Sequence, residues 1–183
     1  MVFRLLLIAF LGFSGSAAWA QLQTLRTGSI LVLDQSSLLT RSKLGQDILE
    51  LERAEQAAIL DAGQLVTQEL ETEEAELTEL RKTLENDEFR MLADAFNDRV
   101  ELARASQNAI DDAQLLRVET RRREFFQSIL PQLTNIIQKY GAAAIIDRRS
   151  VLLFDKNLDI TLETIELLDE AYAENPDMID LGN

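Results

Sequence analysis

One long stretch without proline constrains the fold of this chain more than any other feature. Residues 37–130 contain no proline, and glycine occurs among them only at Gly45 and Gly63. Alanine, leucine, glutamate and glutamine dominate the stretch, and all four have high helix propensity. Because little in it can end a helix, the stretch predicts long helices rather than a mixture of short elements.

The first helix is predicted over residues 37–84, with Ser36 or Ser37 as its N-cap. The second is predicted over residues 87–140, with Asn86 or Asp87 as its N-cap and Gly141 as its C′ residue. At 1.5 Å per residue, the two helices would be about 70 and 80 Å long. Consecutive helices joined by a tight turn form an antiparallel hairpin, whose tip is expected near residues 84–88.

The apolar seam of this hairpin is expected to be narrow. Leu44, Leu51, Ala58 and Leu65 lie seven residues apart, and a second heptad series is displaced from the first. Apolar side chains then crowd near the tip, where they either pack as a cap or stay partly exposed for binding. The candidate binding residues along the hairpin are Leu65, Leu70, Leu77, Leu80, Leu84, Phe89, Leu92, Phe96 and Val100.

Charge is distributed unevenly over a chain whose formal net charge is −14. Residues 54–88 contain eleven acidic residues and only two basic ones, Arg81 and Lys82. This run is either a solvated helix face or a surface that attracts cationic or unfolded partners. Its sign disfavours nucleic acid and anionic lipid, which proteins bind through Lys and Arg.

A basic cluster follows in the second helix, at Arg117 and at residues 121–123. Glu119 and Glu124 lie among these arginines, which predicts ion pairs between neighbouring turns of the same helix. An anion-binding site is the alternative.

The first twenty residues have the pattern of a secretory signal peptide. Arg4 precedes an apolar run that is too short to span a bilayer, and Ala18 and Ala20 form a small-residue site that predicts cleavage before Gln21. An uncleaved anchor is the alternative, which the glycines at 12 and 15 disfavour. The mature chain, residues 21–183, is therefore expected to be exported and soluble.

Residue types that are absent exclude much of enzyme chemistry. The chain has no histidine and no cysteine, so it lacks the usual general base, the Ser-His and Cys-His pairs, and the usual zinc ligands. It also has no glycine-rich phosphate-binding loop. We expect no catalytic residue, no metal site and no cofactor.

The remaining residues, 21–36 and 141–183, are predicted to form a small β head within the same domain as the hairpin. Residues 30–33 read as a buried strand, and residues 143–146 and 151–154 as a β-hairpin. A helix beginning near Thr161 offers Leu162, Ile165 and Leu168 as one apolar face. One helix covers only one face of the strands, which predicts oligomerisation through the other. The candidate contact residues are Ile30, Val32, Ala143, Ile145, Val151 and Leu153.

The predicted fold class is thus α+β and mostly α. A signal segment, "ILVLD", a helical hairpin and "AAAIIDRRSVLLFDKNLDIT" follow one another in an order that resembles the Skp/OmpH family of periplasmic chaperones. The resemblance implies a homotrimer with a shared β barrel. It also implies three hairpin tentacles around a cavity that holds unfolded outer-membrane proteins without ATP.

The charge departs from the pattern of that family, whose tentacles are often described as basic. The acidic hairpin gives no support for binding to membranes or lipopolysaccharide, so client capture would rest on apolar contact. A periplasmic coiled-coil spacer or adaptor with one defined partner is the alternative function.

Removal of the first twenty residues can be tested by mass. When the full chain is expressed with an active secretion pathway, intact-mass measurement should give a species that begins at Gln21. Replacing both Ala18 and Ala20 by leucine should retain the precursor, since the cleavage site needs small residues. A precursor of unchanged mass in the native chain would contradict the prediction.

Overall fold

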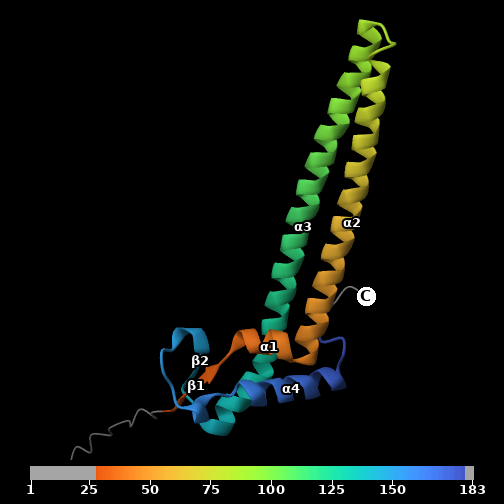
Figure 1. Ribbon diagram of the computed structural model, residues 1–183. Coiled ribbons are helices and arrows are strands. Elements are labelled where there is room, and N and C mark those ends of the chain that lie inside the picture. Colours follow the sequence, from red (N-terminus) through yellow and green to blue (C-terminus); the bar gives the residue numbers. More distant parts are fainter. Residues whose placement is uncertain (1–27, 180–183) are drawn as a thin grey trace, which may run out of the picture.

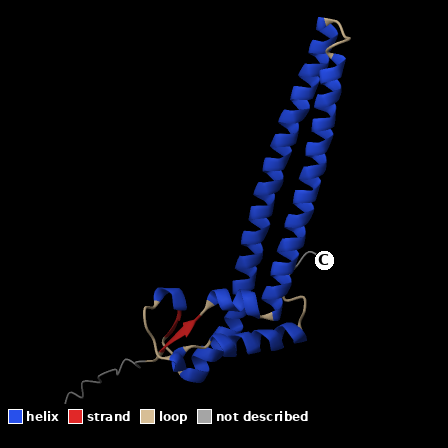
Figure 2. Ribbon diagram, in the orientation of Figure 1, coloured by secondary structure: helices blue, strands red, loops and turns tan. Residues whose placement is uncertain are grey.

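A computed structural model describes residues 28–179, in which a long helical hairpin stands on a small head (Figure 1). Strands occur only in the head, whereas both arms of the hairpin are helical (Figure 2). The predicted cleavage site at Ala18, Ala20 and Gln21 lies outside the described residues. The elements in chain order are β1 (Ile30–Leu33), α1 (Gln35–Arg41), α2 (Lys43–Leu80), α3 (Asn86–Tyr140), β2 (Ala144–Asp147), the 3₁₀ turns η1 (Arg148–Ser150) and η2 (Lys156–Leu158), and α4 (Thr161–Glu174).

The predicted hairpin is confirmed, with α2 and α3 side by side and a turn between Leu80 and Asn86 at the tip. Asn86 or Asp87 as N-cap was wrong, because Glu85 occupies that position and its side chain makes no capping bond. Gly141 as the helix-ending residue is confirmed, with a left-handed φ of 59°. That conformation favours glycine, which has no Cβ to clash with the backbone.

A continuous first helix from residue 37 was wrong, since Ser42 separates α1 from α2. Ser42 has an extended backbone, with φ −71° and ψ 153°, and its hydroxyl accepts a hydrogen bond from the backbone N–H of Gly45 at 3.1 Å. A serine cap therefore overrides the helix propensity of its neighbours. The N-cap of α1 is Asp34 rather than Ser36 or Ser37, because its carboxylate accepts from the N–H of Ser37.

The head contains a two-stranded parallel sheet in place of the predicted three strands. Ile30 pairs with Ala144 and Leu33 with Asp147, so α1, α2 and α3 together form the connection between β1 and β2. On its other side β1 meets the segment before α4, where the N–H of Ile160 donates to the carbonyl of Val32 at 3.0 Å. Both edges of β1 are therefore occupied within one chain.

The predicted strand over residues 151–154 was wrong. Asp147 accepts a hydrogen bond from the N–H of Arg149 at 2.7 Å and also pairs with its guanidinium, which ends β2 in a 3₁₀ turn. The chain then leaves the sheet instead of returning along β2. Leu152 is fully exposed and Leu153 is 91% exposed, so residues 28–179 leave these two leucines of the segment uncovered.

The main core lies where the base of the hairpin meets α1, α4 and the sheet. Leu44 and Ile48 of α2 and Phe125 and Ile129 of α3 are almost completely buried there. From α4, Ile165 and Leu168 are buried as predicted, but Leu162 is exposed and was wrong as a core residue. Full burial of a large apolar side chain contributes about 1.5–3 kcal/mol, so this core fixes the hairpin to the head.

The junction of α1 and α2 depends on the absence of a side chain at Gly45. A Cβ at that position would overlap the backbone carbonyl of Leu39. We expect Gly45→Ala to lower the free energy of unfolding by more than about 2 kcal/mol, measured by urea denaturation followed by circular dichroism. Gly63→Ala is the matched control, since its Cβ would only approach the Gln107 side chain at 3.4 Å. That control should be neutral or stabilising by up to about 1 kcal/mol, and equal losses in both variants would contradict the packing described.

Candidate binding site

A cleft of about 860 Å³ lies between α2 and α3, in the distal half of the hairpin. Three of the predicted binding residues, Leu70, Phe96 and Val100, lie in its walls. Small residues contribute to the space, because Ala62 and Gly63 of α2 and Ala103 of α3 carry little or no side chain into it. The cleft is thus a consequence of the alanine-rich sequence that also favours the helices.

Apolar side chains of this cleft remain accessible to water. Val66 is 43% exposed and Ile110 is 39% exposed, although both line the space between the helices. A coiled coil of ordinary packing would bury side chains at such positions against the partner helix. The seam is therefore an open apolar groove rather than a filled interface.

A second cleft of about 820 Å³ lies closer to the head and extends the groove. Leu60 and Leu115, both exposed, lie in its walls. Ile59 and Gln107 line both clefts, so the two lie next to each other along the hairpin. We refer to the two clefts together as the hairpin groove.

The other predicted binding residues are dispersed. Leu77 is buried between the helices, whereas Leu65, Leu80 and Leu92 are exposed. Leu84 and Phe89 are partly buried at the tip, where the Arg81 guanidinium lies 4.7 Å from the centre of the Phe89 ring. Val66 and Ile110 were not among the predicted binding residues, although Ile110 continues a heptad series with Phe96 and Ala103. The alanines and the glycine that line the cleft were the signal that could have assigned both to it.

At the level of the proximal cleft, an ion-pair cluster joins the two helices near the head. The Arg121 guanidinium donates to Glu55 at 2.8 Å, and Arg122 pairs with Glu52 at 3.1 Å. The predicted pairing with Glu119 and Glu124 on the same helix was wrong, because the partners lie on α2. Hydrogen bonding from Arg121, which is largely buried, lowers the pKa of the Glu55 carboxyl below its usual value despite the opposing effect of burial.

Negative charge is concentrated on the part of the hairpin that projects from the head. Residues 54–112 contain sixteen acidic and five basic residues. One of the five, Arg99, is paired with Glu73 across the helices. The groove is therefore apolar within and set in a strongly anionic surface.

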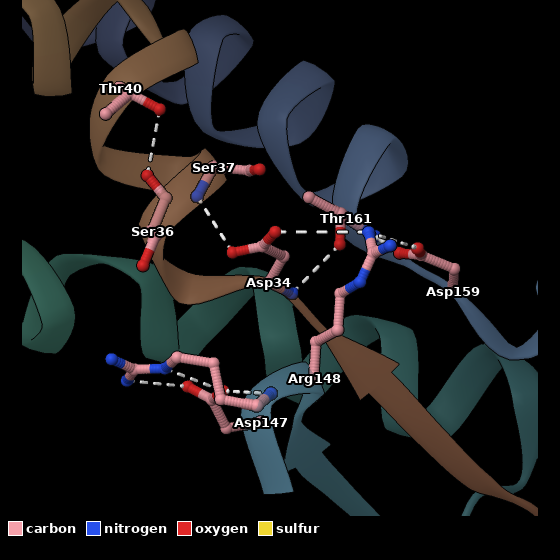
Figure 3. Close-up of polar contacts among 9 residues, drawn as sticks. Asp34, Ser36, Ser37, Thr40, Asp147, Arg148, Asp159 and Thr161 are labelled. Atoms are coloured by element: carbon pink, nitrogen blue, oxygen red, sulfur yellow. Dashed lines mark hydrogen bonds and ion pairs between the residues drawn. The ribbon is translucent and has the colours of Figure 1, made fainter. Parts of the chain in front are cut away.

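A polar cluster in the head fixes the start of the exposed segment 151–154 (Figure 3). Arg148 reaches Asp159 at 3.8 Å and Asp34 at 4.0 Å, and the N–H of Asp34 donates to the Thr161 hydroxyl at 2.9 Å. The Arg148 guanidinium also lies 5.7 Å from the centre of the Phe154 ring. These contacts hold both ends of the segment while its two leucines point to solvent.

The predicted oligomerisation residues fall into three groups in the head. Ile30, Ala143 and Leu153 are exposed, Ile145 and Val151 are partly buried, and Val32 is buried in its own chain. Val32 is therefore not accessible to a second copy and could support an interface only by packing under the residues that form it.

Residues 28–179 contain neither a candidate metal site nor a candidate membrane span. No group of three acidic side chains is arranged to hold a metal ion there. No helix in that range combines the length and hydropathy needed to cross a bilayer.

The fold defines a class of architecture, namely a long antiparallel helical hairpin anchored in a small α+β head. It is similar to the crystal structure of an OmpH-like candidate outer membrane chaperone from Caulobacter crescentus, with a TM-score of 0.74 and 13% sequence identity. The similarity covers 79% of this chain and 85% of that one, and at this identity it shows a shared fold. No protein-family profile and no curated protein sequence matches the chain.

The Glu55–Arg121 pair makes stability depend on pH in a defined direction. The pKa of Glu55 is lowered in the folded state, so its contribution is present above its ordinary value of 4.5 and is lost as pH falls through the folded-state pKa. Glu55→Gln should cost about 1 kcal/mol near pH 7, and the difference from the wild type should shrink below about pH 4. Urea titrations at several pH values measure this, with Glu69→Gln, an exposed glutamate, as the control. A difference that stays constant down to pH 3 would show that the pair does not stabilise the fold.

Proposed function

We propose that this protein is an ATP-independent holdase chaperone of the periplasm, which binds unfolded outer-membrane proteins and keeps them from aggregating. The observation that carries the proposal is the open apolar groove along a hairpin that projects far beyond the head. Exposed apolar surface on a water-soluble fold marks a place where something binds. The fold shared with an OmpH-like candidate outer membrane chaperone supports the same role.

The mechanism is physical rather than chemical. An unfolded barrel strand exposes apolar side chains at every second residue. Many weak contacts along the hairpins hold such a chain through multivalency and still allow its release. Because the chaperone binds the unfolded state selectively, it lowers the free concentration of aggregating chains without an energy source.

Assembly into a homotrimer through the head would place several hairpins around one client. The exposed leucines at 152 and 153 support this part of the proposal, since an apolar segment held at both ends is suited to pack against another copy. β2 also has an edge that pairs with no strand of the described chain. Ile30, Ala143 and Leu153 are the accessible candidate contacts.

The partners are therefore expected to be unfolded polypeptides and further copies of the chain. Neither nucleic acid nor anionic lipid fits a hairpin with this excess of acidic residues. The location follows from the predicted signal peptide and from the nature of the clients. We expect no enzymatic activity and no cofactor.

One experiment tests the oligomer and the holdase role together. Light scattering on a sizing column gives the mass of residues 21–183, alone and after mixing with an outer-membrane barrel diluted from urea. We expect a trimer that forms a soluble complex with the barrel. Replacing Leu70, Phe96 and Val100 by serine should leave the trimer intact and weaken suppression of barrel aggregation several-fold.

Two further variants separate the parts of the proposal. Leu152→Ser with Leu153→Ser should dissociate the trimer, whereas Leu102→Ser, which removes an exposed leucine from the hairpin, should not. A wild-type protein that leaves several unrelated barrels to precipitate would overturn the holdase role. In that case the adaptor with one defined partner would be the better explanation.

A further inference from the structure

The hairpin groove has a combination of charge and shape that selects among unfolded segments. We propose that it binds extended polypeptide segments in which apolar residues alternate with lysine or arginine. It should bind these more tightly than equally hydrophobic segments in which aspartate or glutamate takes the place of the basic residues. This proposal rests on the holdase role, since it specifies which parts of a client the hairpin holds.

The shape of the groove fits one polypeptide strand. It extends along α2 from Leu49 to Glu74, which at 1.5 Å per residue is about 38 Å. An extended strand of about twelve residues has that length. The small side chains at Ala62, Gly63 and Ala103 leave room in the floor for the apolar side chains of such a strand.

The charge of the groove determines what should flank those apolar side chains. Glu71 and Glu74 lie in the wall of the distal cleft, where Arg104 is the opposing cation. In the proximal cleft Glu52 is already paired with Arg122, and the exposed Arg53 offsets the exposed Asp111, so the negative charge of the groove walls lies in the distal cleft. The surrounding sixteen acidic and five basic residues give the groove a negative electrostatic potential. This potential lowers the free energy of a bound cationic side chain and raises that of a bound acidic one.

The same charge disfavours the other obvious occupant, the hairpin of a second copy. Residues 54–112 of each hairpin carry eleven more acidic than basic residues, and two hairpins packed groove to groove would bring these like charges together. Like charges at close range cost free energy at moderate salt. An apolar groove that repels its own copies stays available for a partner of opposite charge.

The test uses two labelled peptides of about twelve residues, both with leucine at every second position. One carries lysine at the alternate positions and the other carries glutamate. Fluorescence anisotropy with the full mature protein should show binding of the lysine peptide at least about tenfold tighter than that of the glutamate peptide. The preference should decline as salt is raised through the physiological range.

Two sets of variants test whether the groove itself is the site. Ala62→Leu with Ala103→Leu fills part of the distal cleft and should weaken binding of the lysine peptide about fivefold or more. Ala105→Leu with Ala113→Leu adds the same volume at exposed positions outside both clefts and should have no effect. Glu71→Gln with Glu74→Gln should reduce the preference for lysine. Glu101→Gln with Asp112→Asn, which removes equal charge outside the clefts, should reduce it less.

Each result either supports or overturns the proposed peptide preference of the groove. Equal affinity for the two peptides overturns the charge preference, and equal effects of the groove variants and their controls overturn the groove as the site. Light scattering that shows hairpin-to-hairpin association, lost in the filled variant, assigns the groove to a second copy instead. If barrel aggregation is still suppressed in any of these cases, the holdase role stands and only the present inference fails. If it is not suppressed by the wild type, the holdase role fails first.

Discussion

Packing at the base of the hairpin is the interaction on which the rest of the structure depends. Phe125 and Ile129 of α3 are buried against Leu44 and Ile48 of α2, and α4 closes the same core. The seam above this core is rich in alanine and open to water, so it contributes little to holding the helices together. The hairpin is therefore stable because its base is fixed, and its outer part is free to present apolar surface.

Charge and hydrophobicity act together on that outer part. An open apolar groove on a neutral hairpin would favour self-association. The excess of acid along residues 54–112 opposes this and keeps the groove accessible. The cross-helix pair of Glu55 with Arg121 lies at the level of the proximal cleft, where it joins the two helices by hydrogen bonds instead of apolar contact.

Sequence patterns predicted the parts of the fold that depend on local preference. A proline-free run of strong helix formers and a glycine at 141 were enough for the two helices and the end of the second. They failed where a single side chain or a distant segment decides the outcome. Ser42 interrupts a helix that propensity favours. Asp147 ends β2 in a 3₁₀ turn, so no β-hairpin forms there, and β2 pairs in parallel with the distant β1. Of the candidate site, Leu70, Phe96 and Val100 were predicted as binding residues. Heptad spacing placed Ile110 in the seam but did not show that it stays accessible, and Val66 follows only from how the helices face each other.

The central claim is that the open seam of the hairpin, and not the head, holds the client. Hydrogen–deuterium exchange of the mature protein with and without an unfolded outer-membrane barrel tests it most directly. We predict that added protection concentrates in residues 58–74 and 96–110, while α4 and the β1–β2 pair exchange as in the free protein. Protection confined to the head, or none in either helix of the hairpin, would contradict the claim.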